Sequence, residues 1–132
     1  MTRHILTPLL AVALAVQAGV AGATTANELL AGYSRQAGSA ATADRGRAFF
    51  NTTHGREWSC ATCHGATPTG GGKHASTGKP IGALAPAANA ERFTDPAKVE
   101  KWFRRNCNDV LGRECAPAEK ADVLAWLMSL KP

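Results

Sequence analysis

The residues best suited to chemistry are two cysteines and a histidine that fall within five positions. Cys60, Cys63 and His64 form the pattern CxxCH inside the segment SCATCHG. Two thiols at this spacing can form thioethers with the two vinyl groups of one porphyrin, and the adjacent histidine then lies under the iron as an axial ligand. The motif therefore predicts one covalently attached haem c, with Cys60 and Cys63 as attachment points and His64 as the proximal ligand.

Two other chemistries use closely spaced cysteines. A thioredoxin-like pair requires a surrounding βαβ pattern, which the sequence lacks, and it leaves the following histidine without a role. A zinc site made of all four cysteines would usually contain a second close pair, whereas Cys107 and Cys115 are eight residues apart. Both alternatives are weaker than haem attachment but stay open here.

The first 23 residues have the pattern of a secretory signal peptide. Arg3 and His4 precede an apolar run at residues 5–16, and Ala21, Gly22 and Ala23 form a small-x-small cleavage pattern. Such a run spans about 18 Å as a helix against about 30 Å of hydrocarbon, so a retained anchor is disfavoured. The sequence predicts a periplasmic domain at residues 24–132 without a membrane span.

In an oxidising compartment the two remaining cysteines are expected to pair. Cys107 and Cys115 are predicted to form a disulfide, with two buried thiols as the alternative. Closure of so short a loop stabilises the fold by roughly 2 to 3 kcal/mol in the chain-entropy model. It also fixes the chain directly after Asn106.

Length and charge exclude several classes of protein. A chain of 132 residues has room for one domain, so a large multidomain enzyme is excluded. The net charge of +5 is too mild for a dedicated nucleic-acid-binding protein. Aromatic residues are only 6% of the chain, so a core of side chains alone would be thin.

Apolar spacing and capping residues predict four helices and a long loop. The helices are residues 27–37, a helix that begins at 42–44, a helix from 94–96 to 112, and a helix that begins at 117. Residues 52–92 show no strand-like alternation and are predicted as loop. So long a loop in a compact domain suggests that something other than peptide fills its middle.

Asn106 falls on the apolar stripe of the third of these helices, with Val99, Trp102, Phe103 and Val110. Burial of an unpaired carboxamide costs on the order of 1 to 3 kcal/mol, so Asn106 needs a partner. From the residues alone, a hydrogen-bonded asparagine near the helix end is favoured over an iron ligand.

The usual methionine ligand of electron-carrying cytochromes is missing. Met1 leaves with the signal peptide, and Met128 lies on what looks like the core face of the last helix. His54 and His74 are long-loop histidines that could reach the iron but fit a solvated loop better. Lys73 and Lys79 fit surface charges near the haem or a partner.

Six segments carry a resemblance to a known family. They are GRAFF (46–50), SCATCHG (59–65), TGKPIGALAP (77–86), RFTDPAKVEKW (92–102), RNCNDVLGREC (105–115) and PAEKADVLAWL (117–127). Together they resemble the sphaeroides haem protein family of class I c-type cytochromes, over most of residues 24–132. The RNCN segment with the second cysteine is specific to that family.

The resemblance implies an all-α class I cytochrome c fold around one haem, with an extra N-terminal helix at residues 27–37. The Gly46/Phe50 face is expected to cross the last helix near Trp126. Asn106 matches the family's sixth ligand of the ferric haem, and the family's disulfide maps onto Cys107 and Cys115. The related cytochrome c'' has a histidine in place of Asn106, so its bis-histidine coordination does not carry over. The resemblance is loose over the loop at residues 51–59, and the family assigns no role to His54.

The resemblance also implies a function. An amide oxygen is a hard donor that suits Fe(III) better than Fe(II), so Asn106 is expected to leave the iron on reduction and open it to O₂, NO or CO. Electrons are expected from a dihaem c-type cytochrome, and catalytic turnover of a small oxidant stays open. The alternatives are a plain electron carrier that stays six-coordinate and, more distantly, a sensor or structural haem module. Four cations are expected either to dock an acidic partner or to form a solvated face: Lys73, Lys79, Arg104 and Arg105.

Overall fold

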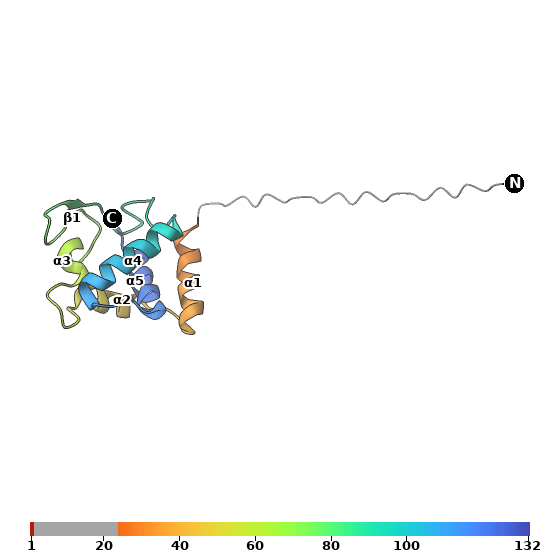
Figure 1. The fold of residues 1–132 in the computed structure, drawn as a ribbon. Helices are drawn as coiled ribbons and strands as arrows, with labels where there is room; N and C mark the ends of the chain where they lie inside the picture. The colour runs from red at the N-terminus through yellow and green to blue at the C-terminus, as the bar shows by residue number, and fades with distance from the viewer. Residues whose placement is uncertain (2–23) are drawn as a thin grey trace.

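The computed structural model of the chain describes residues 24–132 together with Met1, and the predicted signal peptide otherwise lies outside the described residues. The described part contains α1 (Ala26–Ala37), α2 (Ala43–Asn51), α3 (Cys60–His64), β1 (Gly72–Lys73), β2 (Pro80–Ile81), α4 (Pro96–Leu111) and α5 (Pro117–Ser129). This helical architecture confirms the expected all-α fold, including the additional N-terminal helix (Figure 1). None of these helices is long and apolar enough to cross a membrane.

The predicted helix boundaries agree with the structure because capping residues set them. The Thr42 side chain accepts the backbone N–H of Arg45 at the start of α2. Asp95 accepts the N–H of Lys98 at the start of α4, and Pro96 occupies the first turn, where no N–H is needed. Gly112 ends α4 in the left-handed conformation at φ 73°, which glycine adopts without strain.

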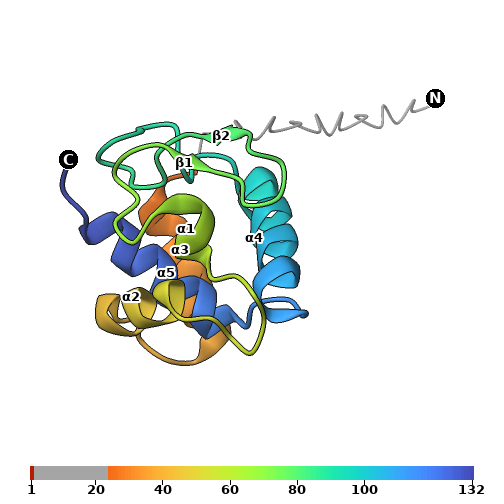
Figure 2. The same cartoon turned by 90° about the vertical axis from the view of Figure 1, so that its left-hand side faces the viewer.

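Helix α5 is the buried helix on which α1 and α2 pack (Figure 2). One face contributes Val123, Trp126 and Leu127 to a core cluster with Phe50 of α2. The opposite face contributes Ala121 and Leu124 to a second cluster, with Tyr33 of α1. The extra helix α1 thus covers apolar surface that α5 would otherwise expose to water.

The crossing of α2 over α5 confirms the expected close contact. A Cβ atom at Gly46 would collide with the backbone carbonyl of Asp122, so the two helices touch backbone to backbone here. One turn further along α2, the Phe50 ring lies 4.9 Å from the Trp126 ring, centroid to centroid. The Asp122 carboxylate accepts the backbone N–H of Thr42 and two N–H groups of Arg45, which closes the same contact.

The prediction that all of residues 52–92 form loop is wrong in two places. The haem motif forms the short helix α3, and β1 pairs antiparallel with β2, Gly72 opposite Ile81. Strands of two residues are too short for an alternating pattern to show in the sequence. Between the strands the backbone N–H of His74 donates to the carbonyl of Lys79 at 2.9 Å, which closes the connecting turn.

Trp102 was expected on the buried stripe of α4, and this prediction is wrong. The buried positions of α4 are Val99, Cys107 and Val110, whereas the Trp102 side chain is 43% exposed. With about 100° of rotation per residue, Trp102 lies about a quarter turn away from Phe103, at the edge of the stripe. Helical spacing places it beside the core but does not bury it.

A polar cluster joins α1, α4 and α5. The hydroxyl of Tyr33 donates to Glu100 at 2.6 Å, and Lys120 Nζ donates to the other carboxylate oxygen at 2.7 Å. Burial raises the pKa of Glu100, but the hydrogen bonds from Lys120 and Tyr33 outweigh it and hold the pKa below its usual range. Burial and the neighbouring Glu100 raise the pKa of Tyr33, so its hydroxyl keeps its proton.

Replacement of Gly46 by alanine should destabilise the protein by at least about 2 kcal/mol, because the added methyl group meets the backbone of α5 rather than a movable side chain. The measurement is urea unfolding of the oxidised holoprotein, followed by circular dichroism. Gly32→Ala in α1 is the matched control, since its Cβ would have no atom closer than 4.0 Å. The control should gain up to ~1 kcal/mol from helix propensity. Equal stabilities of the two variants would contradict the close crossing.

Stability should depend on the charge of Glu100 in acid. The folded pKa of Glu100 lies below its value of 4.5 in the unfolded chain, so its contribution is complete above that pH and declines as the pH falls through the folded pKa. Glu100→Gln should therefore be less stable than the wild type at pH 7, and the difference should shrink below about pH 4. Thermal unfolding at a series of pH values measures this, and a constant difference would refute it.

Candidate haem site

Helix α3 presents the three motif side chains to one pocket. Ser59 caps this helix by accepting the backbone N–H of Thr62, and the Thr62 hydroxyl accepts the N–H of Ser59 in return. Positions three and four apart lie on the same side of a helix, so Cys60, Cys63 and His64 face the same way. All three line one pocket, as the sequence predicted for the attachment of one group.

The pocket lies between α3, the β1–β2 segment and the C-terminal half of α4. It encloses about 420 Å³, including its open mouth. Its walls come from segments far apart in the sequence: Trp58, Ser59, Cys60, Cys63, His64, His74, Ile81, Asn106, Asp109 and Val110. The structure thus brings Asn106 to the same cavity as the CxxCH motif.

Burial sets the protonation of the motif. Burial lowers the pKa of His64 to about 4, with smaller contributions from the positive charges of Arg92 and His74. The imidazole is therefore neutral at pH 7, which is the form that offers a lone pair to a metal. Burial also raises the pKa of the Cys60 thiol to about 11, and Cys60 and Cys63 are not bonded to each other. The residues present fit a haem attached through two thiols and held by a neutral histidine.

A glycine that the sequence analysis did not single out holds the following loop against the motif. A Cβ atom at Gly72 would collide with the carbonyl of Cys63, so β1 lies directly on α3. The backbone N–H of Ala75 lies 3.3 Å from Cys63 Sγ on the same side. The run of three glycines at residues 70–72 was the available signal for such a close backbone approach.

Asn106 is half-buried at the pocket, and no hydrogen bond joins its side chain to another described residue. Two positions further along, the Asn108 amide donates to the carbonyl of Arg104 at 2.9 Å, the usual occupation of a helix asparagine. The hydrogen-bonded role favoured from the residues alone thus describes Asn108, not Asn106. The Asn106 carboxamide remains available to something in the pocket.

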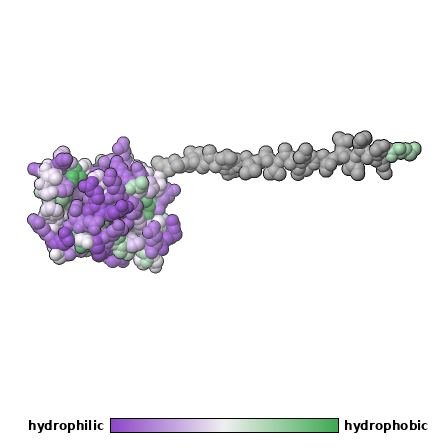
Figure 3. Space-filling view, in the orientation of Figure 1, coloured by the Kyte–Doolittle hydropathy of each residue, from purple (hydrophilic) through white to green (hydrophobic). Residues whose placement is uncertain are grey.

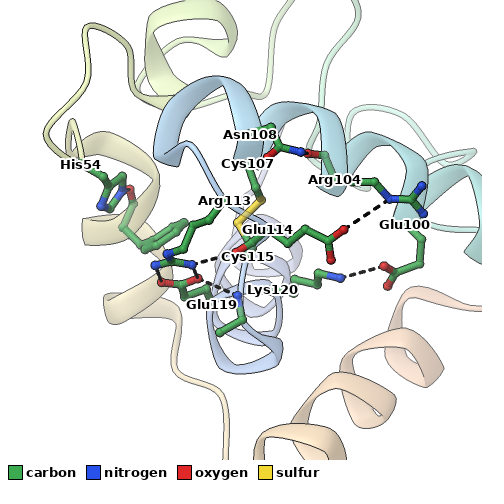
Figure 4. The surroundings of a disulfide bond; sticks show 12 residues. His54, Glu100, Arg104, Cys107, Asn108, Arg113, Glu114, Cys115, Glu119 and Lys120 are labelled. Carbon is green, nitrogen blue, oxygen red and sulfur yellow. Dashed lines mark hydrogen bonds and ion pairs between the residues drawn. A yellow bond between two sulfur atoms is a disulfide. The ribbon is translucent and has the colours of Figure 1, made fainter.

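A disulfide joins Cys107 to Cys115, directly after Asn106 (Figure 4). It ties the C-terminal turn of α4 to the segment before α5. The Arg113 guanidinium pairs with Glu119 at 2.7 Å and also donates to the carbonyl of Glu114, so the connecting loop is ordered by polar contacts as well. Because these two sulfur atoms are bonded to each other, the four-cysteine zinc site and the pair of free thiols are both excluded.

Of the other candidate iron ligands, only His74 lines the pocket. His54 does not line the pocket; its Nε2 lies 2.9 Å from the carbonyl of Phe49, and its ring stacks on Phe49 at 4.4 Å. His74 does line the pocket, and its Nδ1 accepts the backbone N–H groups of Ser76 and Thr77. Both His54 and His74 were expected to be solvated loop histidines, and this expectation is wrong because both are half-buried. Met128 packs on the apolar core cluster of Tyr33, Ala121 and Leu124, in agreement with its predicted core position.

Three lining residues were missed by the sequence analysis. Trp58 precedes the motif, Ile81 belongs to the second strand, and Asp109 lies one turn beyond Asn106 on α4. The spacing of three residues between Asn106 and Asp109 was a usable signal, since both must lie on one side of a helix. Lys73 and Lys79 are exposed on the β1–β2 segment, as expected for surface charges.

Comparison with known proteins identifies the relatives of this chain. A family profile described as a domain of unknown function, DUF1924, matches residues 36–127. The cytochrome c-type protein SHP of Cereibacter sphaeroides is 55% identical over 119 residues, which cover 86% of this chain and 92% of that protein. Cytochrome c'' of Methylophilus methylotrophus is 48% identical over 88 residues, which cover 64% of this chain and 61% of that protein.

Solved structures of the same two relatives resemble the fold of this chain. The structure of oxidised SHP, described as an oxygen-binding cytochrome c, has a TM-score of 0.77 and 52% identity, and the match covers 83% of this chain and all of that one. The crystal structure of oxidised cytochrome c'' has a TM-score of 0.73 and 40% identity, with 81% of this chain and 95% of that one covered.

The covalent cofactor predicted from the CxxCH motif is therefore confirmed as haem c. The class I fold expected from the resemblance is confirmed as well. The chain belongs to the sphaeroides haem protein family of class I c-type cytochromes.

Proposed function

We propose that this protein is a periplasmic haem protein that binds small diatomic gases once it is reduced, with Asn106 as a labile sixth ligand. When bound, the haem supplies an iron that exchanges one electron and accepts a sixth ligand. The observation that carries the proposal is the half-buried Asn106 side chain, which lines the same pocket as the CxxCH motif and has no hydrogen bond to another described residue.

The motif residues hold the cofactor. Cys60 and Cys63 would form the two thioethers, and the neutral imidazole of His64 would bind the iron. The Phe50 ring lies 6.1 Å from the His64 ring and packs on Trp126 beyond it, so the core restricts where the imidazole can move. An imidazole restricted in this way would bind the iron in both oxidation states.

Asn106 would bind the iron only in the oxidised protein. Its amide oxygen is a harder donor than imidazole or thioether and would favour Fe(III), so reduction would release it. Once released, the amide N–H would be free to donate a hydrogen bond to a bound gas. Two relatives support this behaviour: SHP is described as oxygen-binding, and a solution structure of cytochrome c'' addresses the basis of haem-ligand detachment.

The proposal extends to cellular context. The leader at residues 1–23 directs the chain to the periplasm, and a dihaem c-type cytochrome supplies the electron. The alternative, a carrier that stays six-coordinate, draws support from His74, because this histidine also lines the pocket and is a second candidate ligand. One spectroscopic experiment separates the two.

Reduced wild-type protein should be high-spin and should change its visible spectrum when CO is added, whereas a six-coordinate carrier would be inert. Asn106→Ala should change the ferric spectrum, because the sixth ligand is lost, and should leave CO binding to the reduced protein intact. Asn108→Ala is the matched control, since Asn108 bonds only to its own helix and does not line the pocket. If Asn106→Ala kept the wild-type ferric spectrum, Asn106 would not be the sixth ligand, and His74 would be the remaining candidate.

The disulfide should matter for ligation as well as for stability. The double variant Cys107→Ser, Cys115→Ser should lose roughly 2 to 3 kcal/mol of stability, because the unfolded chain gains the freedom of an open loop. Its ferric protein should also show a larger high-spin fraction, since α4 is freer to withdraw Asn106. Arg113→Gln, which breaks an exposed ion pair in the same loop, should cost less than about 1 kcal/mol and leave the spectrum unchanged. An unaltered ferric spectrum in the double variant would show that the disulfide does not help to hold Asn106 on the iron.

A further inference from the structure

Trp102 on α4 is the one large apolar side chain that residues 24–132 leave exposed, at 43%. The guanidinium of Arg105 lies over its ring, 5.2 Å from the centroid, a cation–π contact. Tryptophan and arginine are the residues that most often dominate binding energy at protein interfaces. An exposed pair of this kind, on a helix that has its own buried face, indicates a surface that a partner covers.

The charges within one helical turn of Trp102 on its face of α4 are positive, and the exposed Asp95 and Asp109 lie two turns away on either side. Lys98, Lys101 and Arg105 are exposed on the outer face of α4, and none of them forms an ion pair with a described residue. Arg104, by contrast, lies 3.6 Å from Glu114. We call Lys98, Lys101, Trp102 and Arg105 the Trp102 patch. The view onto α4 shows a predominantly hydrophilic face (Figure 3), so complementary charge, rather than apolar area, governs what can dock there.

The Trp102 patch borders the candidate haem site. Trp102, Asn106 and Asp109 are spaced by four and three residues and therefore form one stripe along α4, and the last two line the pocket. One helical turn, about 5.4 Å of rise, separates Trp102 from Asn106. A protein docked on the patch would therefore place its own redox centre near the pocket mouth.

From these observations we infer that the Trp102 patch is the docking surface for an acidic electron-carrying protein. This inference rests on the proposed function only in that the haem accepts an electron. In the complex the partner is oxidised by one electron and the ferric protein is reduced. The net charge of +5 opposes a second copy of this chain on the same surface. The set differs from the cations expected from the sequence: Lys73 and Lys79 lie on the β1–β2 segment, and Arg104 is engaged by Glu114.

Stopped-flow reduction of the oxidised holoprotein tests the inference, with flavodoxin hydroquinone as an acidic probe donor. Each flavin passes one electron to the protein and becomes a semiquinone. The triple variant Lys98→Gln, Lys101→Gln, Arg105→Gln should lower the second-order rate constant at least tenfold at low salt, and the difference should vanish at high salt. Trp102→Ala should lower the rate at every salt concentration. On addition of oxidised flavodoxin, the NMR signal of the Trp102 indole should shift, while that of buried Trp126 stays in place.

A second triple variant, Arg35→Gln, Arg47→Gln, Lys131→Gln, is the matched control. It removes the same number of charges from exposed positions on α1, on α2 and near the C-terminus, and should change the rate less than twofold. Equal losses in the two triple variants, a static Trp102 signal, or a Trp102→Ala protein with an altered visible spectrum would each overturn the assignment. All variants should bind CO like the wild type, so failure of the docking surface is distinguishable from failure of gas binding.

Discussion

The backbone contact between α2 and α5 at Gly46 is the constraint on which the rest of the structure depends. It brings Phe50 onto Trp126, and the Phe50 ring lies 6.1 Å from His64. The position of α3, which carries His64, therefore depends through the Phe50 side chain on α5. A side chain at residue 46 would separate the helices and act on a site it does not touch.

The two sides of the pocket are held in different ways. His64 lies between the core and a loop that is pressed on α3 at Gly72, so its surroundings are packed from several directions. Asn106 belongs to a long helix whose C-terminal end is fixed by one disulfide and by exposed polar contacts. The carboxamide itself is free of partners in the described structure. Under the proposed function, a firmly held His64 and a lightly held Asn106 are what the site needs if only Asn106 is to detach.

Local rules predicted most of the fold, because helix ends are decided by capping residues and the motif by its own spacing. Thr42, Asp95 and Gly112 fixed boundaries that the structure reproduces. Nothing local showed that Trp102 would be exposed, since burial at the edge of a helical stripe depends on how close the next element comes. The positions of His74 and Asp109 at the pocket and the close approach of Gly72 to Cys63 depend in the same way on tertiary packing. The choice between the two roles considered for Asn106, an iron ligand or a hydrogen-bonded helix asparagine, depended on coordinates as well.

Under the proposed function, gas binding and electron entry would share one helix of this small domain. Asn106 and the Trp102 patch lie on the same helix, α4, with Asn106 on the side toward the pocket and the cations on the side toward solvent. The cluster of Tyr33, Glu100 and Lys120 ties the N-terminal half of this helix to α1 and α5, and the disulfide ties its C-terminal end. With both ends of α4 fixed, the helix would not need to move if Asn106 left the iron as proposed, and a rotation of the Asn106 side chain would be sufficient. A partner docked on the outer face can therefore stay in place while the pocket changes state.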